Sequence, residues 1–493
     1  MTDSSPERSE CCDKNPAGSG SLATTECLDL SCRWTVLPLV VSSLLWLLVG
    51  SAALTLSQIK LVALSFLSGY EALSYGRLEG IASSCLVFGF GIPALLASGV
   101  WLQSRLGRTP LQGAIGLHIF GIVWNITLLA GVFGLATGDG SGLVGFELPR
   151  YAATPMACAY VVGAAVMLLN LKLRREREMY PTQWFLLLSV LWFGWSFTGA
   201  VLTQSMTVTG LLHYIVGLWF RQQYLWLTLV PGYIAITLYL VPKLAKVPLQ
   251  NRSLAMSVFW TLVFLAPFGG VPASAPLPAW LVGLGAVTHV LVLIPVLGLF
   301  FIFKNSRGDG DCPMRNTSEG RLISAATVFF LSAAVLSWLG SVTALAKVVD
   351  STSFSKGVSI LLVLGAFGLG ISALVHHMIP RLTGGSWASN DLLRAQGMLS
   401  AVAVLGLAVA LVGAGISQGL KTSPSSGGVV DLIRISRPFF ALAVLSSLAY
   451  LGAQLLLLGA VLNQVYRSVN VCCIPMIRLW LSPMEIKKGV VRS

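Results

Sequence analysis

The chain has 493 residues, of which 55% are hydrophobic and only 10% are charged, and its mean hydropathy is +0.80. A water-soluble domain of this size needs far more charge on its surface, so a soluble globular fold is excluded. The formal net charge of +13 follows the predicted membrane topology, and it therefore does not indicate nucleic-acid binding.

Three regions follow one another along the chain. Residues 1–33 are polar and predict a flexible cytoplasmic tail, residues 34–466 predict a membrane domain, and residues 467–493 predict a basic cytoplasmic tail. Apolar runs of about 18 or more residues are long enough to cross a bilayer as helices. The membrane domain contains twelve such runs: 34–58, 81–104, 112–136, 152–171, 183–204, 221–242, 254–270, 279–303, 322–346, 357–379, 395–418 and 438–465. The fold class expected is therefore all-α and polytopic.

The basic residues indicate the orientation of these helices. If both termini are cytoplasmic, 23 of the 32 Lys and Arg residues fall in segments on the cytoplasmic side. Such a bias is typical of cytoplasmic loops. We therefore expect a multi-pass membrane protein, surrounded by lipid, with both termini on the cytoplasmic side.

A short pattern recurs at the ends of three helices. The segments "LYLVPKL" (238–244) and "HHMIPRL" (376–382) end the sixth and tenth helices, and "SRLGRTPL" (104–111) ends the second. Proline is tolerated where a helix has finished its span, and a basic side chain there reaches the interface. Helices two, six and ten are four apart in order. The pattern predicts three arcs of four helices.

The five histidines are weighed individually. His376 and His377 suggest a metal or heme site, but we identify no third donor, and we expect them to be interfacial polar residues beside Arg381. For His118 and His289, inside helices, a hydrogen-bonded packing role and a functional polar role both remain open. His213 is expected in a loop before the sixth helix.

The cysteines carry a weaker signal. The N-terminal cysteines match no standard zinc spacing, so they are expected to be reduced thiols, with metal binding or lipid attachment as the alternative. They are Cys11, Cys12, Cys27 and Cys32. Two further thiols, Cys472 and Cys473, follow the last predicted helix.

Several segments together resemble subunit I of the heme–copper oxidases, in particular the C-family (cbb-type) cytochrome c oxidases. The resemblance covers roughly residues 29–470. It is carried by the order and spacing of "YGRLEGIASSCLVFGFG" (75–91), "YPTQWFLLLSVLWFGW" (180–195), "LYLVPKLAKVPLQNRSLAMSVFW" (238–260), "LPAW" (277–280), "IPRLTGG" (379–385) and "AGISQGL" (414–420).

The resemblance implies two hemes and one copper ion, held by six histidines, and a cross-linked tyrosine in the seventh helix. Carried over position by position, all seven are substituted in this chain. The histidine positions hold Ala82, Gln222, Pro272, Ala273, Val358 and Ile360, and the tyrosine position holds Ala266. Only Gln222 offers a side-chain donor atom, and an amide is a weak one for such a metal. We therefore expect no heme, no copper and no catalytic residue at these positions.

Three functions remain open from the sequence. The first is a degenerate subunit I-like protein without redox centres, which acts as a scaffold, assembly or regulatory partner of other membrane subunits of a respiratory complex. The second is an active oxidase subunit with unorthodox ligands. The third is a solute carrier or channel on the same helix bundle. The predicted helix interiors lack acidic and basic residues except near their ends, which disfavours a proton path and ion-coupled transport.

Overall fold

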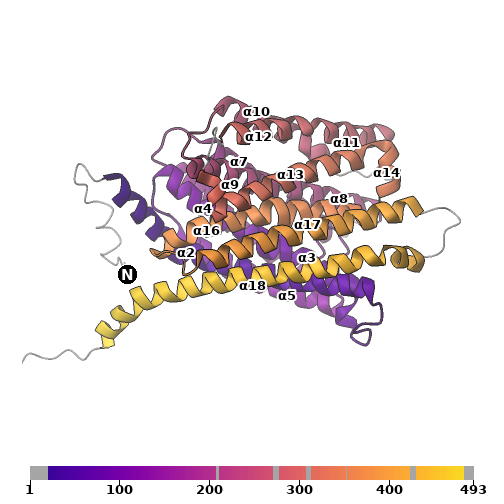
Figure 1. The fold of residues 1–493 in the computed structure, drawn as a ribbon, viewed down its shortest axis with the longest axis horizontal. Coiled ribbons are helices and arrows are strands. Elements are labelled where there is room, and N and C mark those ends of the chain that lie inside the picture. The colour runs from indigo at the N-terminus through magenta and orange to yellow at the C-terminus, as the bar shows by residue number, and fades with distance from the viewer. Residues whose placement is uncertain are drawn as a thin grey trace, which may run out of the picture.

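The computed structural model describes residues 20–206, 210–269, 277–306, 313–350, 352–421 and 429–481. Within these ranges every regular element is a helix, and the long helices run side by side along the longest dimension of the molecule (Figure 1). Among the described residues, eleven helices are long and apolar enough to cross a membrane, and Arg252–Phe268 is a shorter apolar helix. The chain is an all-α, multi-pass integral membrane protein, as predicted.

The peripheral helices agree with the predicted spans. They are α2 (Gly20–Val62), α5 (Ala114–Thr137), α6 (Arg150–Lys172), α7 (Pro181–Ser205), α10 (Arg252–Leu265), α11 (Ala279–Leu291), α12 (Leu293–Ser306), α13 (Ser318–Ser341), α17 (Asn390–Lys421) and α18 (Val429–Leu481). The eighth span is divided between α11 and α12. Short elements lie in the connections: η1 (Glu71–Leu73), η4 (Ala266–Phe268), η5 (Pro313–Asn316) and α14 (Thr343–Val349).

Helices two, six and ten form the centre of the bundle. Each consists of three consecutive elements: α3 (Tyr75–Ser84), η2 (Cys85–Gly91) and α4 (Ile92–Gly107); α8 (Leu211–Tyr224), η3 (Leu225–Leu229) and α9 (Val230–Ala245); α15 (Phe354–Ile360), η6 (Leu361–Gly368) and α16 (Leu369–Thr383). Their apolar windows are 100%, 100% and 94% buried, against 33–56% for the other spans. Consecutive helices pack on one another around this centre.

The middle element of each central helix is a π-helix. These wider turns end 14, 14 and 13 residues before Arg105, Lys243 and Arg381, respectively. They also meet in the core, where the rings of Phe90 and Phe367 pack edge to face at 5.8 Å. π-Helical turns are rare and concentrate at functional sites. Their matched positions extend the repeat that the sequence indicated.

The central helices also end alike. The residue three positions after each of these cations adopts the left-handed conformation and closes the helix through its backbone N–H. These residues are Arg108 (φ 52°), Lys246 (φ 57°) and Gly384 (φ 71°). Left-handed residues commonly terminate helices because their N–H groups bond to otherwise free carbonyls. The repeat therefore extends to the backbone conformation.

Both predicted tails are shorter than the sequence analysis suggested. Helix α2 begins at Gly20, and Asp29 and Arg33 are buried at 3% and 7% exposure. Helix α18 continues to Leu481. The helices therefore continue beyond the predicted boundaries at residues 33 and 466, and in α2 the buried polar contacts of Asp29 and Arg33 accompany this extension. The remaining parts of both tails lie outside the described residues.

An aromatic cluster packs the second, fifth and sixth helices together. Phe88 lies in its middle, with ring centroids 5.2 Å from Phe146, 6.0 Å from Phe197 and 6.3 Å from Phe220. All four rings are fully buried. Aromatic rings contribute large buried areas and favourable edge contacts, so this cluster holds helix six in place beside helix two.

Candidate functional site

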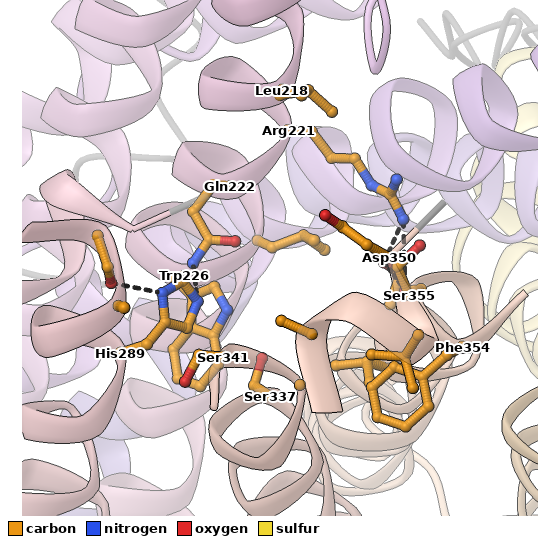
Figure 2. Close-up of a pocket in the computed structure, with 18 of the residues that line it drawn as sticks. Leu218, Arg221, Gln222, Trp226, His289, Ser337, Ser341, Asp350, Phe354 and Ser355 are labelled. Carbon is orange, nitrogen blue, oxygen red and sulfur yellow. Dashed lines mark hydrogen bonds between the residues drawn. The ribbon is translucent and has the colours of Figure 1, made fainter. Parts of the chain in front are cut away.

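A cavity of about 510 Å³ lies beside helix six. Its walls come from α8 and η3, α11, α13, α14 and the start of helix ten, and Figure 2 shows their side chains converging on it. The polar lining consists of Tyr214, Arg221, Gln222, His289, Ser337, Ser341, Asp350, Ser355 and Ser359. Apolar side chains, including Trp226, Val358 and Leu362, line the rest. This size and mixed lining are typical of small-molecule sites.

Gln222 and His289 meet on one wall of the cavity. The Gln222 Nε2 atom lies 3.3 Å from His289 Nε2, and His289 Nδ1 lies 3.2 Å from the Gly285 carbonyl oxygen (Figure 2). A carbonyl only accepts, so Nδ1 carries the proton and Nε2 accepts from the amide. The imidazole is therefore neutral, and the lone pair that could bind a metal is already engaged.

Arg221 lies on another wall of the cavity, next to the loop between α5 and α6. Its Nη2 donates to Ser359 Oγ at 2.7 Å and to the Ser355 carbonyl oxygen at 3.4 Å. Glu147, in that loop, is close enough for the arginine to favour its charged form. Burial and the charge of Glu79 act more strongly, and they raise the pKa of Glu147 to about 7.

A part-buried ion pair joins helices two and ten near this region. Lys356 Nζ lies 2.5 Å from Glu79 Oε2, and the two side chains are 20% and 30% exposed. Lys356 also lies over the ring of Tyr75 at 5.8 Å. The central helices are longer than the apolar runs, so they include charges that the sequence analysis placed outside the helix interiors.

The positions to which the family resemblance assigns ligands are distributed between the core and the cavity. Ala82 and Ile360 are buried, at 2% and 6% exposure, on helices two and ten. Val358 and Gln222 line the cavity. Ala266 is buried at the end of the seventh helix, whereas the positions 272 and 273 lie outside the described residues. The side chains at Ala82, Val358 and Ile360 carry no atom that could coordinate iron, so these residues do not fit the family's hemes.

His376 and His377 occupy a different environment from the one expected. Both are buried between helices, at 1% and 4% exposure, so they are not the surface-exposed polar residues that an interfacial role would suggest. His376 Nδ1 lies 3.3 Å from Ser318 Oγ, and the His377 carbonyl accepts a hydrogen bond from Arg381. Packing of α4, α9 and α13 around helix ten encloses both rings. Their position beside Arg381 was predicted correctly.

The other sequence candidates remain apart. His118 is exposed on α5, so the expected packing role is not observed, and His213 is half-buried at the start of α8, not in a loop. Cys27 and Cys32 lie in α2, where Cys32 is a buried free thiol, while Cys11 and Cys12 lie outside the described residues. Among the described residues, His, Cys, Asp and Glu nowhere form a group of three that could hold a metal.

Sequence analysis missed the proximity of His289 to Gln222. The two residues are 67 positions apart, and His289 lies in a helix to which no ligand had been assigned. Its position within an apolar run was the available signal, because a polar ring in a membrane helix needs a partner.

Comparison with known proteins provides a family context. Residues 35–449 match the family described as Cytochrome C and Quinol oxidase polypeptide I. The chain is 26% identical to Cytochrome c oxidase subunit 1 of Rhodobacter capsulatus over 52% of its length and 51% of that protein. It is 21% identical to the Cytochrome c oxidase subunit 1 homolog of Agrobacterium tumefaciens (strain T37) over 78% of its length and 75% of that protein.

A third relative is a cbb3-type oxidase subunit, the subfamily that the sequence resembles. The chain is 25% identical to the Cbb3-type cytochrome c oxidase subunit CcoN1 of Stutzerimonas stutzeri, over 46% of this chain and 49% of that protein. In several of these comparisons, the chain spans about half the length of the curated relative it matches.

Proposed function

Because this chain belongs to the family of cytochrome c and quinol oxidase polypeptide I, we propose that it is a subunit I-like protein without redox centres. It acts through contacts with other membrane subunits of a respiratory complex, as a scaffold, assembly or regulatory partner. The proposed location is the cytoplasmic membrane of a bacterium, with both termini on the cytoplasmic side. The start of α2 and the end of α18 lie at the same end of the bundle, which supports such an orientation (Figure 1).

One observation carries the loss of redox function. Ala82, Val358 and Ile360 are buried on the central helices at the positions to which the resemblance assigns iron ligands, and none has a donor atom. A buried heme iron needs an imidazole, thiolate, thioether or phenolate ligand from the protein. These residues therefore support the proposal that the protein binds neither of the family's hemes and does not reduce oxygen.

The copper position leads to the same proposal. Gln222 offers one amide, and the adjacent His289 accepts a hydrogen bond from it through the nitrogen that would bind a metal. A borderline metal such as copper prefers several imidazole or thiolate donors. An amide already bonded to a single imidazole is a poor substitute for three histidines, so we propose that no copper is bound here.

The partner role is tested by gentle purification at native expression level, followed by mass spectrometry of the copurified proteins. We expect other membrane subunits of a respiratory complex in constant ratio to this chain. Recovery of the chain only by itself would count against the partner role.

The cavity supports a second candidate, a carrier or receptor for a small solute. Its polar wall includes Arg221, Gln222 and His289, and its volume of about 510 Å³ is large enough for an organic molecule. Flux or binding measurements in liposomes distinguish this candidate from the first. Transport that is lost when Ser337→Trp fills the cavity, and retained with Val335→Trp on the exposed face of the same helix, would favour the carrier.

A further inference from the structure

The repeat in the central helices places the same two kinds of side chain at the same spacing. In each helix an aromatic residue precedes a cation by four positions, which puts both on one helix face. The pairs are Trp101 and Arg105 in helix two, Tyr239 and Lys243 in helix six, and His377 and Arg381 in helix ten. The arrangement is independent of the cavity: Lys243 follows Gln222 by 21 residues, which is about 30 Å along an α-helix.

The three rings meet in a closed triangle. The centroids of Trp101 and Tyr239 are 5.8 Å apart, those of Tyr239 and His377 are 6.2 Å apart, and those of Trp101 and His377 are 6.3 Å apart. Every contact is edge to face. The central helices therefore converge at this level, and the cations one turn further along must lie close together.

The three cations are close enough for their charges to interact beside this triangle of rings. Lys243 is subject to the charges of Arg105 and Arg381, and His377 is subject to all three cations. Asp29 of α2 offsets one of them, because it forms an ion pair with Arg105 and accepts from Trp101 Nε1 at 3.0 Å. Asp29 pairs directly with Arg105 alone, and Glu319 acts on Arg381 only as a neighbouring charge. Three cations and two carboxylates leave an excess of positive charge.

Two of the cations remain able to bind a ligand. Lys243 is exposed, and it forms no ion pair with any described residue. Arg381 is half-buried, and its hydrogen bond to the His377 carbonyl uses Nη1. Beneath them, His377 Nε2 is buried and has no hydrogen-bond partner among the described residues, whereas the Tyr239 hydroxyl lies within reach of Arg105. Buried polar groups without a partner are uncommon and call for a ligand or water.

We propose that Lys243 and Arg381, with the neighbouring charge of Arg105, form an anion site that holds a phosphate group. Arginine and lysine bind phosphate oxygens through charge-assisted hydrogen bonds, and His377 Nε2 can donate one more when it carries the ring proton. A phosphate could come from an anionic phospholipid or from solution. The site lies at the ends of membrane helices, where phospholipid headgroups are found, so the phospholipid is the expected source. This inference goes beyond the proposed function and does not depend on it.

The test measures phospholipid binding to the delipidated full-length protein by native mass spectrometry. The probes are phosphatidylglycerol, phosphatidylcholine and inorganic phosphate. We expect tighter binding of phosphatidylglycerol than of phosphatidylcholine. In Lys243→Gln the affinity for phosphatidylglycerol should fall about fivefold, which is about 1 kcal/mol for one cation near a membrane surface. The matched control Lys304→Gln removes an exposed cation at the end of α12 and should leave the affinity unchanged.

Each result of this binding experiment either supports or contradicts the proposed anion site. Arg381→Gln should weaken binding as Lys243→Gln does; if it fails to fold, Lys243→Gln still decides, because that side chain is exposed. Competition by millimolar inorganic phosphate would identify solution phosphate as the source. Equal affinities for the two phospholipids without such competition, or equal losses in Lys243→Gln and Lys304→Gln, would overturn the proposal.

Discussion

Removing the Lys356 side chain should destabilise the protein more than removing an exposed cation, because Lys356 pairs with a part-buried carboxylate. The variant Lys356→Met leaves the Glu79 carboxylate part-buried and unpaired, with Glu147 close enough to repel it. Breaking a fully buried pair costs about 3–5 kcal/mol, whereas exposed pairs contribute about 0–1 kcal/mol. With side chains 20% and 30% exposed, we expect a loss of about 2 kcal/mol in the free energy of unfolding.

A double-mutant cycle separates the pair from general packing effects. Glu79→Gln combined with Lys356→Met removes both charges, so most of the lost stability should return. The control Arg394→Met breaks a pair with Asp391 whose side chains are 51% and 88% exposed, and should change little. Reversible unfolding with SDS in mixed micelles measures Glu79→Gln, Lys356→Met, their combination and the Arg394→Met control. If Lys356→Met matches the Arg394→Met control, the reasoning about buried charge is refuted.

Three further predictions concern pH, packing and topology. Because the folded state holds the Glu147 proton up to about pH 7 whereas the ordinary pKa is 4.5, the free energy of unfolding should fall as the pH rises from 4.5 to about 7. The variant Glu147→Gln should flatten that profile, and an unchanged slope would contradict the assignment. Phe88→Ala should cost about 3–5 kcal/mol in chemical unfolding, and Phe133→Ala, at 71% exposure, much less. A cysteine at Ser141 should be labelled by impermeant reagents from outside only; labelling only from the cytoplasm would overturn the topology.

The helices were predictable because a membrane-spanning segment is recognised from its own run of apolar residues. Twelve apolar runs identified the helices, and the basic residues at the ends of helices two, six and ten indicated their equivalence. The ends were less predictable. Helix α2 begins 14 residues before its predicted start because Asp29 and Arg33 find partners on other helices. Such partners are invisible in a one-dimensional hydropathy pattern.

The cavity and the environment of His377 could be recognised only in the three-dimensional structure. His289 reaches Gln222 only because the eighth helix packs beside the seventh and sixth, and the cavity depends on how α13 and α14 lie against helix ten. His377 appeared interfacial because it precedes Arg381 by four residues, yet Trp101 and Tyr239 enclose its ring. Contacts between residues far apart in sequence decide these environments, and single-sequence patterns do not contain them.

The central claim is that this chain carries none of its family's redox centres. The most direct measurement is the absorption spectrum and metal content of the protein purified from heme-replete cells. We predict neither a stoichiometric Soret band nor copper, and no recovery of heme binding in Ile360→His, because Ala82 and Val358 would still offer no donor. A Soret band that shifts on reduction, or one copper ion per chain, would contradict the account.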